Sequence, residues 1–497
     1  MISLDEIRRN FSQCTSNEKK SALGQFFTPD AIANFMASLF SPERLIECSV
    51  LDPGAGIGSL TVALLNRFEG EQAAQTVASI TAVELDTSVI SKLNDTLKQF
   101  DKKDFSYEIL NEDFLTLALN WIQFEPHRRF SHIIMNPPYK KISSTSIQRK
   151  LLHQAGIETV NLYAGFVALC IQLLKNDGEL VAILPRSFCN GPYYKSFRQF
   201  LLRTTNICQI HLFGSRKYLF SDDNVLQENV ILKLRREAPC EHEIKLSWAT
   251  DLTQCDYTEY MVPSSEVVKP DDPEFFIRIP ERLSQGNVLL AETLECSLAT
   301  LDLSISTGPI VDFRVKQFLS PMPQDGTVPL IYPMHLHLTN CTWPMQSAKK
   351  SNSIFQNTTT QKMFFPAGYY CVVKRFSSKE EPRRITASVI SPNNFQSAQY
   401  YGFENHLNVF HQARKGLQKE LAYGLMVFLN SKVVDQYFRT FNGHTQVNAT
   451  DLRQMHYPSK PQLEALGKWA QEQPVLTIEA MDKKVEASLC AHHATII

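Results

Sequence analysis

A short segment in the first third of the chain has the residue types needed to activate a planar aromatic amine. It consists of Asn136, Pro137, Pro138 and Tyr139. Such an amine is a poor nucleophile because its lone pair is delocalised into the ring. Two acceptors, the side-chain oxygen of Asn136 and the carbonyl of Pro137, can localise that lone pair, and consecutive prolines fix φ and stiffen the carbonyl. Tyr139 can stack on the ring. The segment therefore predicts direct transfer of a group from its donor to the amine nitrogen, without a covalent enzyme intermediate.

Acidic residues follow other short apolar runs in the way that Asn136 follows its own. Asp52 and Glu84 each end such a run, and Asp113 comes shortly after a third. Near-continuous apolar strands alternating with helices predict a parallel sheet covered on both faces. Because ligands bind outside the carboxyl ends of such strands, these side chains should share one site. The predicted strands are 49–51, 80–83, 107–110, 132–135, 180–184 and 231–234.

A glycine-rich loop directly follows the first predicted strand, with Asp52 before Gly54, Gly56 and Gly58. Glycines let the backbone turn sharply and approach a ligand closely, although a plain strand-to-helix turn has the same composition. At the end of the second strand, Glu84 is placed to accept hydrogen bonds from ribose hydroxyls; the alternative is a solvated acid.

Two further segments complete the expected site. Asp113 can accept a hydrogen bond from an adenine amino group, and Phe114 can pack on the adenine ring, although a phenylalanine alone is more often core. Near the N-terminus, Thr28 can cap a helix whose first residue is Pro29.

The bulk composition is that of a globular protein of two to four domains. The chain has 497 residues, 43% hydrophobic and 20% charged, with a formal net charge of −1. That charge excludes a uniformly basic nucleic-acid coat but allows a local basic cleft. The 11 cysteines include no CxxC pair, so no metal site is expected. Without a signal peptide or membrane span, the chain is expected to be cytoplasmic.

The spacing of apolar residues also divides the chain. We predict a catalytic domain over residues 1–240, a proline-rich connecting segment over 241–290 and a further domain over 291–497. Within the first domain, a helix that includes Phe166 should stop at Gly178, a left-handed C-terminal cap. In the last domain, 369–373 predicts a strand and 421–429 a helix.

Taken in order, these motifs resemble the gamma-class N6-adenine DNA methyltransferases of prokaryotic restriction–modification systems. The sequence GQFFTP at 24–29 comes first, followed by the glycine loop, the acidic strand end and Asn-Pro-Pro-Tyr. The resemblance covers roughly residues 22–235. It implies a Rossmann-like α/β domain that binds S-adenosylmethionine and a C-terminal α+β target-recognition domain. It also implies methylation of adenine N6 in double-stranded DNA, and a separately encoded restriction endonuclease that acts on the same site.

The resemblance also implies individual roles. Phe27 and Thr28 close over the methionine part of the cofactor. The target adenine must be extruded from the duplex, and Tyr139 stacks on one of its faces. An aromatic residue after the fifth strand covers the other face, with Tyr194 the first choice and Tyr193 the second.

Basic and amide side chains supply the candidate DNA contacts. Lys140 and Lys141 follow the catalytic segment, and Arg198 comes later; each is alternatively a solvated surface charge. The C-terminal half, above all residues 441–453, is similar to the BsuBI/PstI methylase subgroup, which is linked to the palindrome CTGCAG. There, Gln446 and Asn448 could read adenine and Arg375 guanine, or each could cap a loop or bind phosphate.

Three other functions compete with this interpretation. An RNA adenine or protein glutamine methyltransferase can use the same Asn-Pro-Pro-Tyr chemistry, but the large C-terminal region favours duplex recognition. A fused restriction nuclease would need an extra segment, and only about 20 residues precede GQFFTP. A DNA-binding module without catalysis is disfavoured because the Asn-Pro-Pro-Tyr segment is intact.

Overall fold

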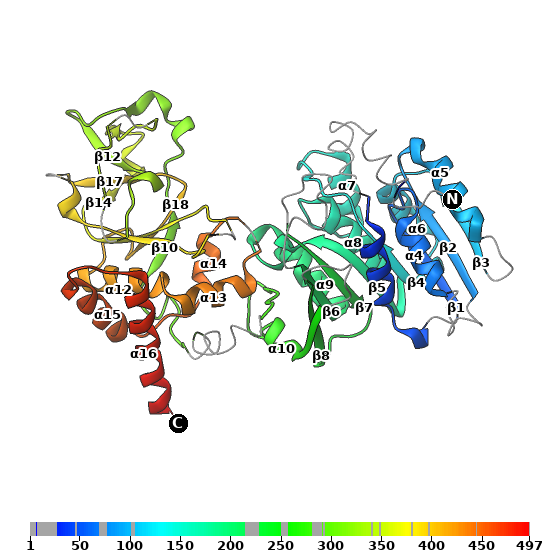
Figure 1. Ribbon diagram of the computed structural model, residues 1–497. Helices are drawn as coiled ribbons and strands as arrows, with labels where there is room; N and C mark the ends of the chain where they lie inside the picture. Colours follow the sequence, from blue (N-terminus) through cyan, green and yellow to red (C-terminus); the bar gives the residue numbers. More distant parts are fainter. Residues whose placement is uncertain are drawn as a thin grey trace. The chain divides into compact units, whose positions relative to one another are not determined.

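The chain folds into two compact units, residues 1–278 and 279–497 (Figure 1). The computed structural model describes residues 6, 27–44, 47–68, 77–100, 105–213, 228–249, 257–280, 291, 294–338, 341–346, 349–378, 381–395, 398–443 and 445–496. Residues 24–26 of the GQFFTP segment therefore lie outside the described part, whereas Phe27 and Thr28 lie inside it.

The first unit is built on one twisted sheet, whose described strands number nine. Their order is β3-β2-β1-β4-β5-β7-β6-β8-β9. The first five pair in parallel, and β7 is antiparallel to both of its neighbours. The strands are β1 (Glu47–Asp52), β2 (Val77–Val83), β3 (Phe105–Leu110), β4 (Phe130–Met135), β5 (Leu174–Pro185), β6 (Asn206–Phe213), β7 (Asn229–Arg235), β8 (Glu243–Ala249) and β9 (Tyr257–Pro263). All six predicted strands are confirmed.

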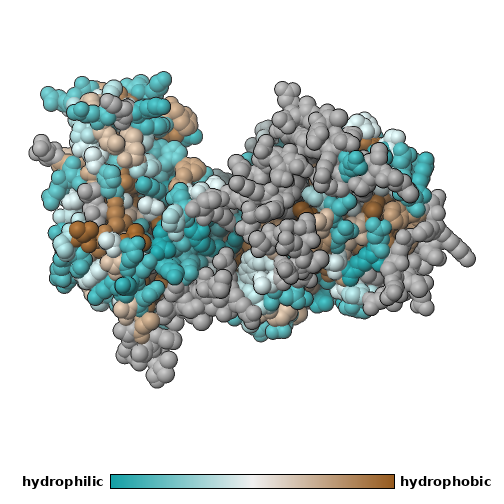
Figure 2. Space-filling model, in the orientation of Figure 1, coloured by the Kyte–Doolittle hydropathy of each residue, from teal (hydrophilic) through white to brown (hydrophobic). Residues whose placement is uncertain are grey.

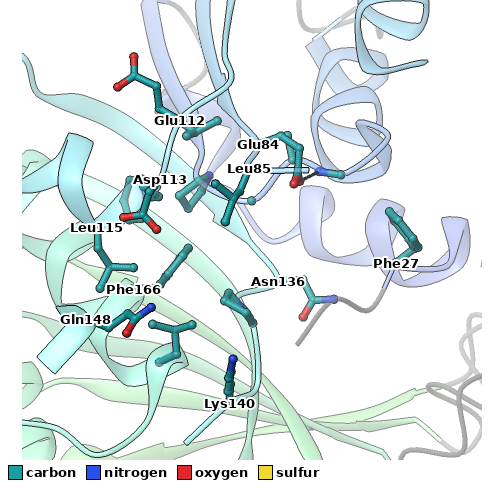
Figure 3. A pocket seen from close by; sticks show the side chains of 18 of the residues that line it. Phe27, Glu84, Leu85, Glu112, Asp113, Leu115, Asn136, Lys140, Gln148 and Phe166 are labelled. Carbon is teal, nitrogen blue, oxygen red and sulfur yellow. Dashed lines mark hydrogen bonds between the residues drawn. The ribbon is translucent and has the colours of Figure 1, made fainter. Parts of the chain in front are cut away.

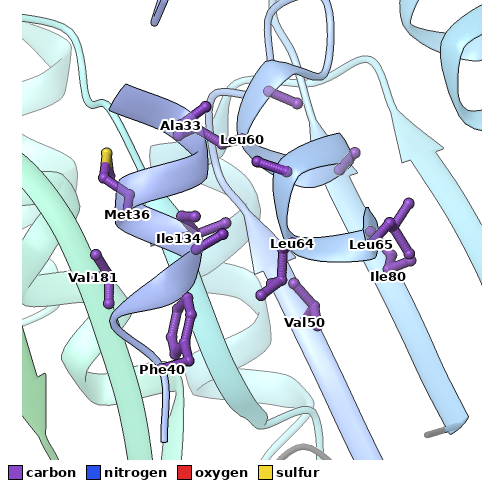
Figure 4. Packing of buried hydrophobic residues seen from close by; sticks show 14 of the residues in the cluster. Ala33, Met36, Phe40, Val50, Leu60, Leu64, Leu65, Ile80, Ile134 and Val181 are labelled. Carbon is purple, nitrogen blue, oxygen red and sulfur yellow. The ribbon is translucent and has the colours of Figure 1, made fainter. Parts of the chain in front are cut away.

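Strands β1, β2 and β3 follow one another in one direction across the sheet, whereas β4 lies on the other side of β1. This reversal of direction positions the site. Right-handed crossovers place the helices before and after such a reversal on opposite faces of the sheet. Figure 4 shows α3 and α4 packed on one face, where Met36, Leu64 and Phe40 meet Val50 and Ile134. The helices are α3 (Asp30–Ser38), α4 (Ser59–Phe68), α5 (Thr87–Leu97), α6 (Phe114–Phe124), α7 (Ile147–Gln154), α8 (Leu162–Leu173), α9 (Lys195–Thr204) and α10 (Ser264–Val267).

The predicted connecting segment 241–290 was wrong in its first part. Strands β8 and β9 extend the catalytic sheet, β8 pairing in parallel with β6, and the first unit runs to residue 278. Charge in this stretch concealed the strands because a strand near the edge of a sheet exposes polar side chains. The predicted Gly178 cap was also wrong: α8 ends at Leu173, β5 begins at Leu174, and Asp177 is the residue with positive φ.

The second unit combines two sheets. An antiparallel sheet has the order β10-β18-β15-β16, and a second has the order β11-β13-β12-β17-β14. Side chains of both sheets, among them Tyr370, Val372, Tyr401 and Phe403, share one core. The strands are β10 (Ser304–Thr307), β11 (Leu319–Ser320), β12 (Thr327–Ile331), β13 (Ser353–Phe355), β14 (Phe365–Pro366), β15 (Tyr370–Lys374), β16 (Ala387–Ile390), β17 (Tyr400–Phe403) and β18 (Leu407–His411).

Helices complete this α+β unit. Helices α12 and α15 approach closely because Gly424 and Gly467 lack side chains: a Cβ at Gly424 would lie 1.9 Å from the carbonyl oxygen of Leu463. The helices are α12 (Lys419–Leu429), α13 (Lys432–Phe441), α14 (Ala449–Arg453), α15 (Lys460–Glu472) and α16 (Ile478–Ile496). Strand β15 and helix α12 confirm the two elements predicted for this region.

The surface drawn in Figure 2 is mostly hydrophilic, and hydrophobic residues reach it in small groups. No described helix has both the length and the apolar composition that crossing a membrane requires.

Candidate active site

The carboxyl ends of the parallel strands surround a cavity of about 460 Å³, a size typical of small-molecule sites. Figure 3 shows Asp113, Leu115 and Phe166 gathered on one side, and Asn136 and Phe27 toward the other. Of the sequence-predicted residues, the following line it: Phe27, Thr28, Gly54, Gly56, Glu84, Asp113, Phe114, Asn136, Pro138, Lys140 and Lys141. The strand-end rule therefore brought together residues that are distant in sequence, from Gly54 after β1 to Asn136 after β4.

The glycine loop, Glu84 and Phe27 interlock. The backbone N–H of Gly56 donates to Glu84 Oε2 at 2.8 Å. Gly56 has a φ of +55°, and a Cβ there would lie 3.1 Å from the ring of Phe27. Any other residue would be strained by this backbone conformation and crowd the ring. The turn is therefore built onto the acid and the aromatic ring that line the cavity.

Glu84 is a buried acceptor at the end of β2. Its second oxygen, Oε1, accepts from the backbone N–H of Asp86 at 2.7 Å. Burial raises the pKa of Glu84, while the two backbone N–H donors act in the opposite direction. Each carboxylate oxygen can accept more than one hydrogen bond, so a ligand hydroxyl can still bind here.

Asp52, predicted to share the site with the other strand-end residues, lies outside the cavity. It is fully buried and does not line the cavity. Its Oδ2 accepts from the hydroxyl of Thr61 on α4 at 2.8 Å, and burial raises its pKa to about 7. The residue therefore joins the end of β1 to the following helix. The loop residues that follow it line the cavity, and Asp52 does not.

Apolar residues and the neighbouring acids Glu112 and Asp113 form the opposite side of the cavity. Asp113 caps α6, its Oδ1 accepting from the backbone N–H of Thr116 at 3.0 Å. Phe114 is buried, and its ring centroid lies 4.9 Å from that of Phe166. Leu85 also lines this side, so the side offers flat apolar surface beside a carboxylate, which suits a purine ring.

Asn136, directly after β4, is held by Thr28. The Asn136 Nδ2 donates to Thr28 Oγ1 at 3.1 Å. The prediction that Thr28 caps the helix was wrong: α3 begins at Asp30, its N-cap is Pro29, and no side chain caps it. The threonine hydroxyl faces the catalytic segment because an extended turn at Pro29 directs it away from the helix.

Tyr139 is anchored at both ends of its side chain. Its hydroxyl donates to the carbonyl of Ile183 on β5 at 3.0 Å, and its ring meets Tyr163 edge-on at 6.1 Å. Burial raises the pKa of this phenol, which keeps it neutral. Neither Tyr139 nor Pro137 lines the cavity, although Pro138 and Lys140 beside them do.

Tyr194 does not occupy the position predicted for the second stacking residue. It is buried against Tyr163, with ring centroids 5.9 Å apart, and its hydroxyl accepts from Asn161 Nδ2 at 2.7 Å. It does not line the cavity. Tyr193, the second choice, is 74% exposed. A short 3-10 turn before α9 sends the first tyrosine outward and the second into the core.

Several lining residues were missed. Leu85 was detectable because it directly follows the strand-end acid. Phe166 stood in a predicted helix stripe, where a core role was the simpler interpretation. Gln148 on α7 also lines the cavity, and no sequence pattern marked it.

Arg198 was wrongly predicted as a DNA contact. It is fully buried. Its guanidinium donates to the carbonyls of Phe188 and Gly191 at 3.0 Å and to that of Glu274 at 2.7 Å. Arg198 joins α9 to the stretch after α10, a role that depends on a segment 76 residues later.

In the second unit, Arg375 and Gln446 lie together, with Arg375 Nη2 at 3.4 Å from Gln446 Oε1. Asn448 is instead the N-cap residue of α14, and its backbone N–H and its Nδ2 both donate to Asp451 Oδ2, at 3.1 and 3.2 Å. The described residues contain no group of three His, Cys, Asp or Glu side chains that could hold a metal ion.

Comparison with known proteins decides the family. The chain is 48% identical over 462 residues to the type II methyltransferase M.BsuBI of Bacillus subtilis, covering 92% of this chain and 91% of that protein. It is 39% identical over 471 residues to M.PstI of Providencia stuartii, covering 93% and 92%. The chain belongs to the type II methyltransferases of restriction–modification systems. This methyltransferase thus acts on DNA at specific sites, and its methyl donor is S-adenosylmethionine.

Two further matches agree with this membership. The Eco57I restriction-modification methylase family matches residues 57–220 of the methyltransferase, a range that begins at the end of the glycine loop and holds Glu84 and Asn136. The structure of a DrdV–DNA complex has a similar fold, with a TM-score of 0.51 at 13% identity, covering 94% of this chain and 59% of that one. The predicted α/β catalytic domain followed by an α+β domain is confirmed.

Proposed function

We propose that the methyltransferase modifies the exocyclic N6 of adenine within one short duplex sequence. The observation that carries this proposal is the Asn136 amide, held by Thr28 on the wall of the same cavity that Glu84 and Asp113 line. A hydrogen-bond acceptor for an amine, placed beside a cavity whose wall suits a nucleoside, is the arrangement that methyl transfer to a ring amine requires.

The cavity fits S-adenosylmethionine by the chemistry of its wall. We assign Glu84 to the ribose hydroxyls, and Asp113 with Phe114 to the adenine, where Leu85 and Phe166 add apolar surface. Phe27 and Thr28, with Gly54 and Gly56, would hold the methionine end. The bound cofactor supplies an electrophilic methyl group.

The chain's own residues prepare the acceptor nitrogen. Because Thr28 accepts from Asn136 Nδ2, it sets the orientation of the amide and so the position of Oδ1. We assign Oδ1 of Asn136 and the carbonyl of Pro137 as acceptors for the two hydrogens of the target amine. This draws the nitrogen lone pair out of the ring's π system, and preorganised acceptors cost no rearrangement during the reaction.

The target base must leave the duplex to reach these acceptors. The Tyr139 ring, immobilised by Ile183 and Tyr163, is proposed to stack on it. Lys140 and Lys141 are exposed and line the cavity, where they can bind flanking phosphates. We propose that the second unit recognises the sequence, and that a separately encoded endonuclease cuts the same site when it is unmethylated. Prokaryotic cytoplasm, where such DNA lies, is the proposed place of action.

The test is transfer of labelled methyl from S-adenosylmethionine to plasmid DNA, followed by nucleoside analysis. Label in N6-methyladenine, confined to one sequence, is the expected result. CTGCAG, which the resemblance in sequence implies, is the first duplex to try. Label in cytosine would overturn the proposed acceptor. Label in ribosomal RNA or a release factor, and none in DNA, would overturn the substrate.

A further inference from the structure

Three loops of the second unit meet at one end of its four-stranded sheet. The first follows β15, the second precedes β18, and the third precedes α14. Because β15 and β18 are antiparallel, with Lys374 opposite Leu407, the end of one strand lies beside the start of the other. The third loop joins them through a bridge between Phe376 and Gln446. These loops comprise residues 375–378, 404–406 and 445–448.

Arg375 and Gln446 present a guanidinium and an amide side by side. Arg375 Nη1 lies 3.3 Å from the carbonyl oxygen of Asn405, and its Nη2 lies 3.4 Å from Gln446 Oε1. Both distances are long for hydrogen bonds, so the edge of a base can replace them at small cost. Each Nη atom also carries a second N–H, since a guanidinium has five donors.

His406 and Phe376 complete the group. The Nδ1 atom of His406 is hydrogen-bonded to Glu404 Oε1 at 2.6 Å. The Glu404 side chain is fully buried, whereas that of His406 is 42% exposed. The Phe376 ring, 49% exposed, lies 5.1 Å from the His406 ring. The ring thus offers an exposed apolar surface beside the histidine. Gly308 is required behind Glu404, because a Cβ there would lie 2.1 Å from the Glu404 carbonyl oxygen.

Buried side chains hold the third loop from inside. Asn442, fully buried, donates to the carbonyl of Gln446 and to Asp451 Oδ2, both at 3.0 Å. Asn408, also buried, donates to the carbonyl of Val447 at 2.7 Å. A loop anchored in this way presents Gln446 with little loss of entropy on binding.

We propose that Arg375, Gln446, His406 and Phe376 form one base-reading cluster for the major groove. The proposal rests on the proposed function and names the residues that choose its substrate. Arginine can pair bidentately with guanine, glutamine with adenine, and an apolar ring can contact the thymine methyl. The charge suits DNA: the nearby acids Glu404 and Asp451 are buried and hydrogen-bonded, and Asp312 is paired with Lys350.

The test compares methylation rates on matched duplexes. The sites that the wild-type protein methylates in a plasmid are mapped first. Then kcat/KM is measured on a short duplex carrying that site and on duplexes with single base-pair changes. Arg375→Ala and Gln446→Ala should each lower discrimination about 10- to 100-fold at one base pair, leaving the other positions discriminated. Arg375→Lys should discriminate less well than wild type but better than Arg375→Ala, because lysine keeps the charge and donors but lacks the planar guanidinium fork.

The controls separate reading from other roles. Lys468→Ala, which removes an exposed lysine of α15 in the same unit, should change nothing. A uniform loss of rate on all duplexes, with a salt slope reduced by about one, would mean phosphate binding and would overturn the proposal. Unchanged discrimination in both variants would overturn it as well. A wild-type protein that methylates no DNA would contradict the proposed function itself. The results with the variants bear only on the cluster.

Discussion

The cavity of the first unit and the base-reading cluster of the second are built in different ways. The cavity is centred on residues that follow β1, β2, β3 and β4, and these parallel strands carry them to one edge of the sheet. The cluster collects residues from three loops beside an antiparallel sheet, where adjacent strands end in opposite directions. A parallel sheet therefore makes a site visible in sequence order, whereas an antiparallel one hides it until the pairing is known.

Arg198 and Arg375 show the same contrast in single residues. In sequence, both were basic residues predicted to contact DNA. Arg198 is fully buried on backbone carbonyls, while Arg375 is partly exposed with two long contacts. Charge alone does not separate a structural arginine from a binding one; the partners of its N–H groups do.

The largest expected effect is on the chemistry of the cavity. Asn136→Ala should lower kcat for methyl transfer at least about 10²- to 10³-fold, because it removes a preorganised acceptor. Cofactor affinity, measured by calorimetry with S-adenosylmethionine, should change little. Undiminished transfer would remove Asn136 from the mechanism, and loss of cofactor binding would make it a binding residue.

Arg198→Ala should destabilise the protein by about 3 kcal/mol or more, because it leaves several buried carbonyls without donors. Denaturant unfolding measures this loss. Arg203→Ala, on the exposed face of the same helix, is the control and should stay within about 0.5 kcal/mol of wild type. If Arg198→Ala instead weakened DNA binding in a stable protein, the contrast with Arg375 would fail.

A pH dependence tests the buried acid beneath the glycine loop. The folded-state pKa of Asp52 is raised to about 7 from an ordinary 3.8, so the folded protein binds its proton more tightly than the unfolded chain. This contribution is complete below about pH 4 and is lost as the pH rises through 7. The free energy of unfolding of Asp52→Asn, relative to that of wild type, should therefore be about 2–3 kcal/mol larger at pH 8 than at pH 5. An equal difference in unfolding free energy at both pH values would contradict the raised pKa.

Thr28→Val should lower kcat about tenfold by removing the acceptor that orients Asn136, a loss expected for one hydrogen bond. Thr28→Ser keeps the hydroxyl and should restore most of the rate. If valine raised KM for S-adenosylmethionine with kcat unchanged, Thr28 would act only on the cofactor.

The smallest effect sharpens the boundary of the cluster. Asn448→Ala should cost about 1 kcal/mol of stability through loss of the α14 cap. Base-pair discrimination should remain as in wild type, unlike that of Gln446→Ala two residues earlier. A change in discrimination here would extend the cluster to Asn448.

The sequence by itself determined the six core strands of the first unit, the site at their carboxyl ends and the acceptor segment. Strand periodicity and residue type are local properties, and the parallel topology follows from their alternation with helices. It also indicated Phe27, Glu84 and Asn136 as members of one site.

Only the tertiary structure decided which residues face the site. Asp52 does not line the cavity, and Tyr194 is buried against Tyr163. Thr28 accepts a hydrogen bond from Asn136 and does not cap α3. Strands β8 and β9 extend the sheet of the first unit. The meeting of Arg375 with Gln446 was equally undetermined. Burial and hydrogen-bond partners depend on segments that are distant in the sequence, 108 positions in the case of Thr28 and Asn136. Residue type does not encode which of these segments will be the neighbour.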